Sequence, residues 1–229
     1  ATRQAQASLL THAGPEIGVA STKAFTTQLA TLLLFALRLA EARGVLDGAH
    51  RADVLAGLRS LPAVLEGLGT IEPAIIGLAE RWQHTESALY LGRGPLYPIA
   101  LEGALKLKEI SYVHAEGYPA GEMKHGPIAL IDRNMPVIAL MPDDEHRART
   151  LGNLQEAAAR EGCLLAFVTR GDRSLERVAS AVIELPKVHP LLNPILYSVP
   201  MQLFPYHMAV LRGCDVDQPR NLAKSVTVE

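Results

Sequence analysis

The segment ALYLGRGPLYPIALEGALKLKEISY, residues 88–112, decides the fold. It opens with four consecutive apolar residues, a pattern typical of a strand that is buried on both faces of a parallel sheet. The turn Gly92-Arg93-Gly94 follows and leads into a helix that we expect over residues 97–112. The sequence leaves two interpretations of this turn open: a tight connection that needs positive φ angles, or an anion site at a helix N-terminus.

Three further short apolar runs repeat this pattern, at residues 137–141, 164–168 and 181–183. Helical stretches separate them, and the last one is expected over residues 191–211, interrupted by prolines. Alternating buried strands and helices are typical of doubly wound α/β proteins. We therefore predict a parallel sheet flanked by helices on both faces, in three α/β/α layers.

The region before these strands is expected to be mostly helical. A short strand is predicted at residues 7–11 and a long helix at residues 21–44, with Ser21 and Thr22 as candidate N-caps. The apolar part of this helix, residues 29–40, is interrupted by an arginine and is too short to span a bilayer, so we expect it to be buried. Two further helices are predicted at residues 52–58 and 71–82, with Pro62 and Pro73 as their boundaries.

The first strand and helix have no earlier partners with which to close a core, so they are expected to belong to a domain that begins upstream. The tail after the last helix has no helical period. We expect three units: the end of a first domain with connecting helices (residues 1–60), a second domain (residues 61–214) and a C-terminal tail (residues 215–229).

Composition excludes several functional classes. The 229 residues carry 22 Lys and Arg against 24 Asp and Glu, and this balance does not suggest a nucleic-acid or anionic-membrane partner. Cys163 and Cys214 are too few for a disulfide framework and too far apart for a metal clip. The two isolated thiols fit a reducing cytosol, and no targeting sequence is evident, so we expect a cytoplasmic protein.

Charged residues follow one stripe of the helix expected over residues 97–112. Glu102, Lys106 and Glu109 are spaced i, i+4 and i+7, so their side chains rise along the same face and could serve one pocket. The alternative for Glu109 is an i, i+3 ion pair with Lys106 on a solvated face, worth only about 0.3 kcal/mol.

Two further ionisable residues have informative settings. His125 ends a Gly- and Pro-rich loop, where an imidazole could exchange protons near neutral pH or could simply be satisfied by a backbone carbonyl. Lys224 lies in the tail, where a lysine is usually a solvated surface residue.

Three segments of the sequence together resemble one family, the isomerase part of glucosamine-6-phosphate synthase, which is built from two sugar-isomerase (SIS) domains. The matching segments are GPEIGVASTKAFTTQL (residues 14–29), the run from ALYLGRGP to HGPIALI (residues 88–131) and DVDQPRNLAKSVTVE (residues 215–229). The resemblance implies an SIS-type three-layer fold. It also implies an enzyme that converts fructose 6-phosphate and ammonia to glucosamine 6-phosphate in amino-sugar biosynthesis.

The resemblance also implies roles for individual residues. Glu109 matches the base that moves a proton between two sugar carbons. Lys106 would bind substrate oxygens or adjust the basicity of Glu109, and Glu102 would hold Lys106 in position. His125 matches a ring-opening histidine that enters the neighbouring subunit's site, which implies a homodimer with shared sites. Lys224 matches the lysine that forms a Schiff base with, or opens, the sugar. The implied substrate-binding residues are Val19, Ala20, Ser21, Glu102 and Ala223, and the resemblance implies no metal and no other cofactor.

The sequence departs from the family pattern at two points. Ala1 is not the N-terminal cysteine of the glutaminase domain, which is expected in the full-length protein but is absent here. No S-x-S-x-x-T run occurs, so the main phosphate loop is expected upstream of these residues. Two other functions stay open: a phosphosugar-binding regulatory module without turnover, and a structural dimerisation fragment without a ligand.

Overall fold

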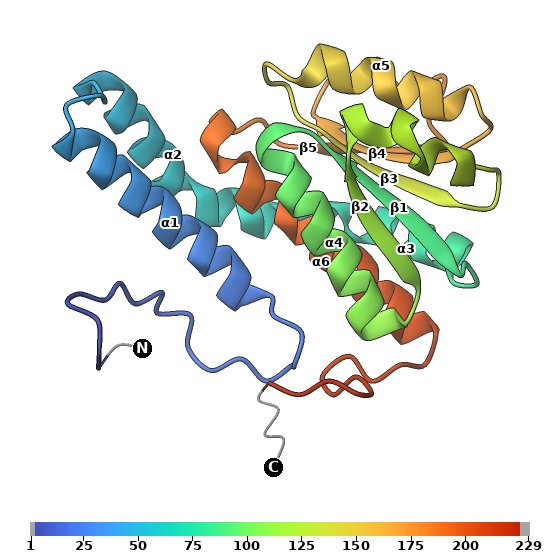
Figure 1. Cartoon of the computed structure of the whole chain (residues 1–229), viewed down its shortest axis with the longest axis horizontal. Helices are drawn as coiled ribbons and strands as arrows, with labels where there is room; N and C mark the ends of the chain where they lie inside the picture. Colours follow the sequence, from blue (N-terminus) through green and yellow to red (C-terminus); the bar gives the residue numbers. More distant parts are fainter. Residues whose placement is uncertain (1–2, 225–229) are drawn as a thin grey trace.

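A five-stranded parallel sheet forms the centre of the computed structural model, which describes residues 3–224 (Figure 1). The strand order is β2-β1-β3-β4-β5, with β1 between β2 and β3, as in a doubly wound sheet. The strands are β1 (Ser87–Gly92), β2 (His114–Pro119), β3 (Pro136–Met141), β4 (Cys163–Thr169) and β5 (Ala181–Leu185). All four apolar runs that predicted strands are confirmed.

Helices cover both faces of the sheet, which confirms the three-layer α/β/α fold. Alternate strand residues face opposite layers: Tyr90 and Phe167 lie in the larger core with α3, α4 and α6, whereas Leu89 and Val168 lie in the smaller core with α5. The helices of these two layers are α3 (Glu72–Trp82), α4 (Tyr97–Ser111), α5 (Arg147–Ala158) and α6 (Asn193–Leu211).

Strand β2 is a feature that the sequence did not indicate, since we expected residues 114–119 to form part of a loop. The segment HAEGYP has no apolar run because β2 is an edge strand, which pairs only with β1. Gly117 belongs to this strand, and a Cβ at this position would lie 2.8 Å from the Cα of Leu101. The edge strand is therefore pressed closely against helix α4.

Prolines do not end helices where the sequence predicted that they would. Pro62 lies inside α2 (Gly48–Glu66), and Pro200 and Pro205 lie inside the continuous helix α6. The helix predicted at residues 52–58 is therefore much longer, and the domain boundary that we expect after residue 60 falls within it. Pro73 does begin α3, where a missing N–H costs nothing.

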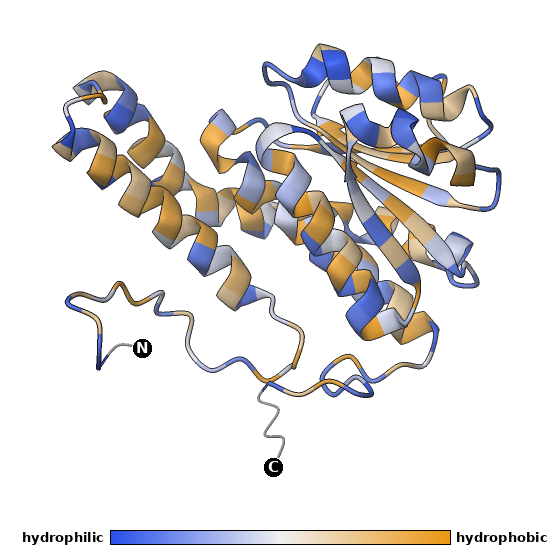
Figure 2. Ribbon diagram, in the orientation of Figure 1, coloured by the Kyte–Doolittle hydropathy of each residue, from blue (hydrophilic) through white to orange (hydrophobic). Residues whose placement is uncertain are grey.

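The N-terminal part differs from expectation in two ways. Residues 7–11 form no strand, because a strand needs a hydrogen-bonded neighbour and none pairs with them among residues 3–224. Helix α1 (Lys23–Ala42) is present as predicted but is not a buried helix, since only Leu37 is buried. Figure 2 shows apolar residues along α1, and Phe35 is 52% exposed.

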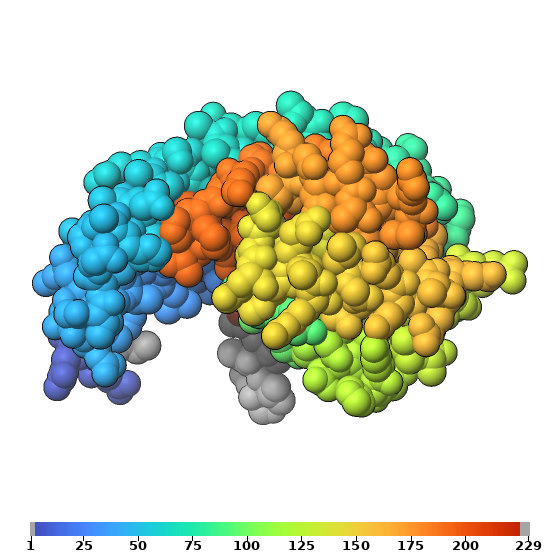
Figure 3. All heavy atoms as spheres, turned by 90° about the horizontal axis from the view of Figure 1, so that it is seen from above, coloured from blue at the N-terminus to red at the C-terminus, as the bar shows by residue number. Residues whose placement is uncertain are grey.

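The α1–α2 pair stands beside the sheet region (Figure 3). Helix α1 contacts α6, and α2 contacts the 3-10 helices η1 (Gly67–Ile71) and η5 (Pro190–Leu192). By length and composition alone, α1 and the helical segment Gly48–Trp82 could cross a membrane. Core helices of soluble proteins pass the same test, so this property is weak evidence for a membrane location.

Candidate functional site

The predicted stripe on α4 is a compact ionic cluster. The Lys106 Nζ atom donates to Glu109 Oε2 at 2.5 Å, and Glu102 Oε1 lies 3.4 Å from the same nitrogen. The Lys106 side chain is only 4% exposed. The ion pair between Lys106 and Glu109 therefore exists, but it does not lie on a solvated face, as the alternative interpretation required.

Two carboxylates share one ammonium group in this cluster, and the charges are poorly hydrated. Burial raises the pKa of Glu102, although the neighbouring Lys106 opposes the shift, and the negative charge of Glu109 adds to it. Buried, unevenly compensated charges are uncommon in a purely structural helix. The cluster is therefore a good candidate for proton-transfer chemistry.

A cavity of about 350 Å³ connects this cluster with the N-terminal segment. Lys106 reaches it from α4, and Glu16, Gly18 and Ala20 line it from the segment before α1. Its other lining residues are Pro15, Ile17, Thr22, Lys23, Ile110, Gln202, Tyr206, Val216 and Asp217. Segments that are distant in the sequence therefore meet at one hollow beside α4.

The predicted sugar-contacting loop is held in place by the core and by the tail. Ala20 is buried in a small cluster with Ile110 and Ala209, and Val216 of the tail packs against it. The Val19 backbone N–H donates to the carbonyl oxygen of Asp217 at 2.9 Å. Residues 19–21 thus lie between α4, α6 and the tail, beside the cavity.

The N-terminus of α1 is capped differently from the prediction. Thr22 occupies the N-cap position, but its side chain does not cap the helix. Glu16 accepts the hydrogen bond from the Thr22 backbone N–H instead, at 2.8 Å. Ser21 precedes the helix, beside the cavity, and makes no cap there.

The tail approaches the same region through several contacts. The Lys224 ammonium donates to the Glu16 carbonyl oxygen and lies 3.8 Å from Glu16 Oε2. The Arg220 backbone N–H donates to the Tyr112 hydroxyl at 2.9 Å, and its guanidinium lies 4.1 Å from the centre of the Tyr112 ring. Ala223 is exposed, and residues 225–229 lie outside the described part of the chain.

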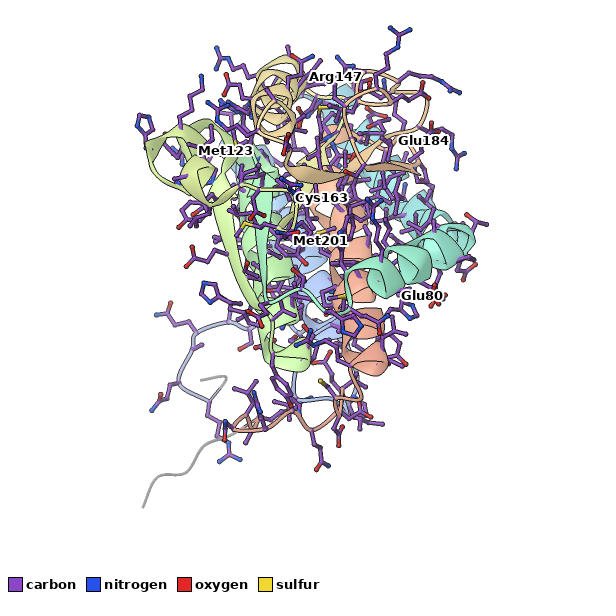
Figure 4. The ribbon with its side chains drawn as sticks, turned by 90° about the vertical axis from the view of Figure 1, so that its right-hand side faces the viewer. Glu80, Met123, Arg147, Cys163, Glu184 and Met201 are labelled. Atoms are coloured by element: carbon purple, nitrogen blue, oxygen red, sulfur yellow. The ribbon has the colours of Figure 1, made fainter. Side chains whose placement is uncertain are left out.

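His125 lies away from this cluster. It ends the 3-10 helix η3 (Ala120–His125), which follows the carboxyl end of β2, and its side chain is 75% exposed. Its Nε2 atom is 4.0 Å from Glu122 Oε2. Figure 4 shows Met123, from the same segment, at the end of the sheet opposite to the tail. Within one chain, His125 therefore does not join the groups around the cavity.

Comparison with known proteins identifies the family. The SIS domain profile matches residues 83–212, from the end of α3 to the end of α6. The chain belongs to the SIS domain family. The matched range contains the whole sheet and the cluster of Glu102, Lys106 and Glu109 on α4 (the α4 cluster). It contains neither the predicted sugar-contacting loop of residues 19–21 (the Val19 loop) nor Lys224.

Relatives of this SIS domain chain extend the similarity to almost all of its residues. It is 51% identical over 218 residues to the glutamine–fructose-6-phosphate aminotransferase (isomerizing) of Bacteroides thetaiotaomicron, covering 95% of the chain and 36% of that protein. It is 52% identical over 228 residues to the same enzyme of Thermus thermophilus, covering 100% of the chain and 38% of that protein. The chain therefore spans little more than a third of these curated relatives.

A solved structure extends the match to three dimensions. The C-terminal domain of glucosamine-fructose-6-phosphate aminotransferase from Francisella tularensis superposes with a TM-score of 0.89 and 45% identity. The alignment covers 95% of this chain and 61% of that one. The similarity therefore includes segments on both sides of the SIS domain.

The glycine-rich turn of the SIS domain has a clear structural role. A Cβ at Gly92 would lie 2.2 Å from the carbonyl oxygen of Leu96, and Gly94 has a φ of +53°. Arg93 donates to Asn153 Oδ1 at 3.1 Å, while its buried Nε has no hydrogen-bond partner among residues 3–224. These contacts support the tight-turn interpretation, and the anion-site interpretation stays a prediction.

Sequence reasoning missed Glu16, although it lies within a segment that carried the family resemblance. A side-chain cap normally comes from the N-cap residue itself, and Glu16 lies six residues before Thr22. Local spacing therefore gives no signal for this contact. Only the fold of the segment before α1 brings the carboxylate back to the helix.

Proposed function

We propose that this chain is the isomerase portion of a glutamine–fructose-6-phosphate aminotransferase. In this reaction fructose 6-phosphate and ammonia give glucosamine 6-phosphate. The observation that carries the proposal is the cluster of Glu102, Lys106 and Glu109, because its central residue, Lys106, is buried and lines a cavity beside the Val19 loop and the tail. The names of the relatives support the same reaction.

The reaction needs a base that moves a proton between adjacent sugar carbons. Ammonia replaces the C2 oxygen, which leaves as water, and forms an imine; Glu109 then takes a proton from C1, the electron pair forms a C1–C2 double bond, and the imine nitrogen takes up a proton. Glu109 returns its proton to C2 while the O1 hydroxyl loses its proton, which leaves an aldehyde at C1 and an amine at C2. Lys106 holds the Glu109 carboxylate at 2.5 Å, and Glu102 in turn holds Lys106.

Lys224 and His125 serve the earlier steps in this proposal. Lys224 opens the sugar or forms a Schiff base with it, from a tail that folds beside the cavity. His125 opens the ring in the site of a neighbouring subunit, so the active protein is a homodimer. The exposed position of His125, away from the α4 cluster, supports this sharing. The glutaminase that supplies ammonia, and a cytoplasmic location, are part of the same proposal.

Replacing Glu109 by Gln tests the assignment of the base. With fructose 6-phosphate and free ammonia, the variant should lose glucosamine 6-phosphate formation by about 10²–10⁴-fold, because no group of suitable basicity replaces the carboxylate. Glu80→Gln is the matched control, since Glu80 is an exposed carboxylate on α3. Isomerisation at the wild-type rate by Glu109→Gln would reject the assignment. Sugar binding without turnover by the wild type would favour a regulatory module.

Mixing two inactive variants tests the shared site. In a dimer that contains one Glu109→Gln and one His125→Ala subunit, one of the two sites keeps both wild-type groups. Random mixing should therefore restore about a quarter of the wild-type activity. Absence of recovery in a preparation that forms mixed dimers would place both groups in the site of a single chain.

A further inference from the structure

Glu16 makes contacts that none of the roles above explains. It lies on the irregular segment before α1, and its side chain is only 12% exposed. Its Oε1 atom accepts from the Thr22 N–H at 2.8 Å, from the Thr22 hydroxyl at 3.2 Å and from the Ala24 N–H at 3.3 Å. The first turn of α1 contains no acidic residue, so Glu16 provides the negative charge at this helix N-terminus.

The rest of Glu16 faces the tail. Its Oε2 atom lies 3.8 Å from Lys224 Nζ, and its backbone carbonyl accepts a hydrogen bond from the same ammonium. The two carboxylate oxygens are thus divided between the helix and the lysine. Burial raises the pKa of Glu16, but the hydrogen bonds from Thr22 and Ala24 and the charge of Lys224 outweigh it, and the net shift is downward. Glu16 is therefore ionised at neutral pH.

The position of Glu16 connects the lysine with the cavity. Glu16 and Lys106 line the same cavity. Glu16 pairs with Lys224 and Lys106 pairs with Glu109, so both ion pairs lie beside this cavity. Residues 214–224 contain no helix or strand that could orient a lysine. An ion pair with a fixed carboxylate limits the positions that a long, flexible side chain can occupy.

We propose that Glu16 is a positioning residue that holds the Lys224 ammonium at the edge of the sugar cavity. The inference rests on the proposed function, because it assigns Lys224 to the sugar. Glu16 touches neither the sugar nor the reacting carbons in this proposal and acts only through Lys224. The N-terminus of α1 already holds the Oε1 atom of Glu16 by hydrogen bonds. Glu16 therefore places the Lys224 ammonium at a fixed position relative to this helix end, which the Val19 loop precedes.

Glu16→Gln separates the two functions of this residue. The amide keeps an oxygen that can accept from Thr22 and Ala24, but it removes the charge that faces Lys224. We expect kcat to fall about tenfold, which corresponds to the loss of one partly buried ion pair. The KM for fructose 6-phosphate should change less than about twofold, because positioning acts on the chemical step. The melting temperature should fall only slightly, because the amide keeps the hydrogen bonds to α1 but removes the negative charge at its N-terminus.

Ala24→Gly is the matched control. Ala24 does not line the cavity, and the substitution weakens the first turn of α1 by about 1 kcal/mol but leaves the Glu16 carboxylate and Lys224 in place. This variant should lower the melting temperature slightly and leave kcat unchanged. A fall in kcat as large as that of Glu16→Gln would indicate that capping of α1, not the lysine contact, matters.

A double-mutant cycle tests whether Glu16 acts through Lys224. In the Lys224→Met background, Glu16→Gln should cause no further loss of activity. A full additional tenfold loss would overturn the proposal. If a wild-type protein that includes the upstream domains forms no glucosamine 6-phosphate, the proposed function fails, whereas an active wild type with an unaffected Glu16→Gln variant rejects only the role of Glu16.

Chemical labelling gives a readout that does not depend on activity. Brief acetylation with acetic anhydride, followed by mass spectrometry of peptides, measures the reactivity of each lysine. Lys224 should react several-fold faster in Glu16→Gln than in the wild type, because an ion-paired ammonium is a poor nucleophile. Lys108, which is exposed on α4, serves as the internal reference. Equal reactivity of Lys224 in both proteins would contradict the proposed contact.

Discussion

The sheet region and the α1–α2 pair are both rich in apolar residues, but they bury these residues to different degrees. Every residue of β3 and β4 is buried between two helical layers. In α1 only Leu37 is buried, and in α2 only Val54 and Leu61. The sheet region therefore contains its own core, whereas the helix pair has apolar surface that residues 3–224 do not cover. The candidate site lies where these two regions meet.

Paired phenylalanine substitutions give the largest expected contrast between the two regions. Phe167→Ala in β4 should lower the free energy of unfolding by about 3–5 kcal/mol, because it leaves a cavity in the core. Phe35→Ala on the exposed face of α1 should change it by less than about 0.5 kcal/mol. Urea titrations followed by circular dichroism measure both values. A large loss for Phe35→Ala would mean that this face is covered in solution, and the contrast would disappear.

An acid titration should show a smaller effect that belongs to the sheet region. The hydrogen bonds from Arg147, at 2.6 and 2.8 Å, lower the pKa of Asp172 from 3.8 to about 2, and Ser174 contributes. Because this folded-state pKa is depressed, the contribution is complete above pH 4 and is lost as the pH falls towards 2. It amounts to about 2 kcal/mol.

Asp172→Asn tests this contribution. The variant should be less stable than the wild type at pH 6, and the difference should shrink as the pH falls towards 2. The single tryptophan, Trp82, is buried in the sheet region, so its fluorescence reports on this part of the molecule. A constant difference in stability between pH 6 and pH 2 would exclude the ion pair as its source.

The smallest effect is expected where the tail meets α4. Tyr112→Phe removes the hydroxyl that accepts from the Arg220 N–H but keeps the ring beneath the guanidinium. The loss should be about 0.5–1.5 kcal/mol and should be local. Hydrogen exchange of residues 214–224 should become faster, while exchange in β3 and β4 stays unchanged. If exchange in the tail is slower or unaltered, the contact between the Arg220 guanidinium and the Tyr112 ring is sufficient to hold the tail, and the hydrogen bond to the hydroxyl is not needed.

The sequence predicted the sheet well because buried parallel strands are continuous apolar runs. It missed β2, since an edge strand pressed against α4 needs no such run. It also predicted that α1 would be buried, because apolar composition cannot tell whether a covering partner is present. Both errors have one physical cause: the structure and burial of a segment depend on the elements that pack against it, which the sequence of the segment does not show.

In the candidate site, too, the sequence predicted the contacts within one helix but not the contacts between distant segments. Helical spacing on its own brought Glu102, Lys106 and Glu109 together, and the structure contains that cluster. The proximity of the tail to the segment before α1 could only be inferred from the family resemblance. The contact between Glu16 and Lys224 had no local signal, because it depends on two segments that meet only in the folded chain.

The hydrogen bond between Val19 and Asp217 joins residues at opposite ends of the described chain. A contact of such long range can form only after the intervening residues have become compact, since closing a long loop earlier costs entropy without any packing in return. The loop and tail should therefore assemble last during folding. In a refolding experiment, protection of the Val19 amide from hydrogen exchange would lag behind protection of the amides of β3 and β4, and the delay would measure how long the cavity takes to close.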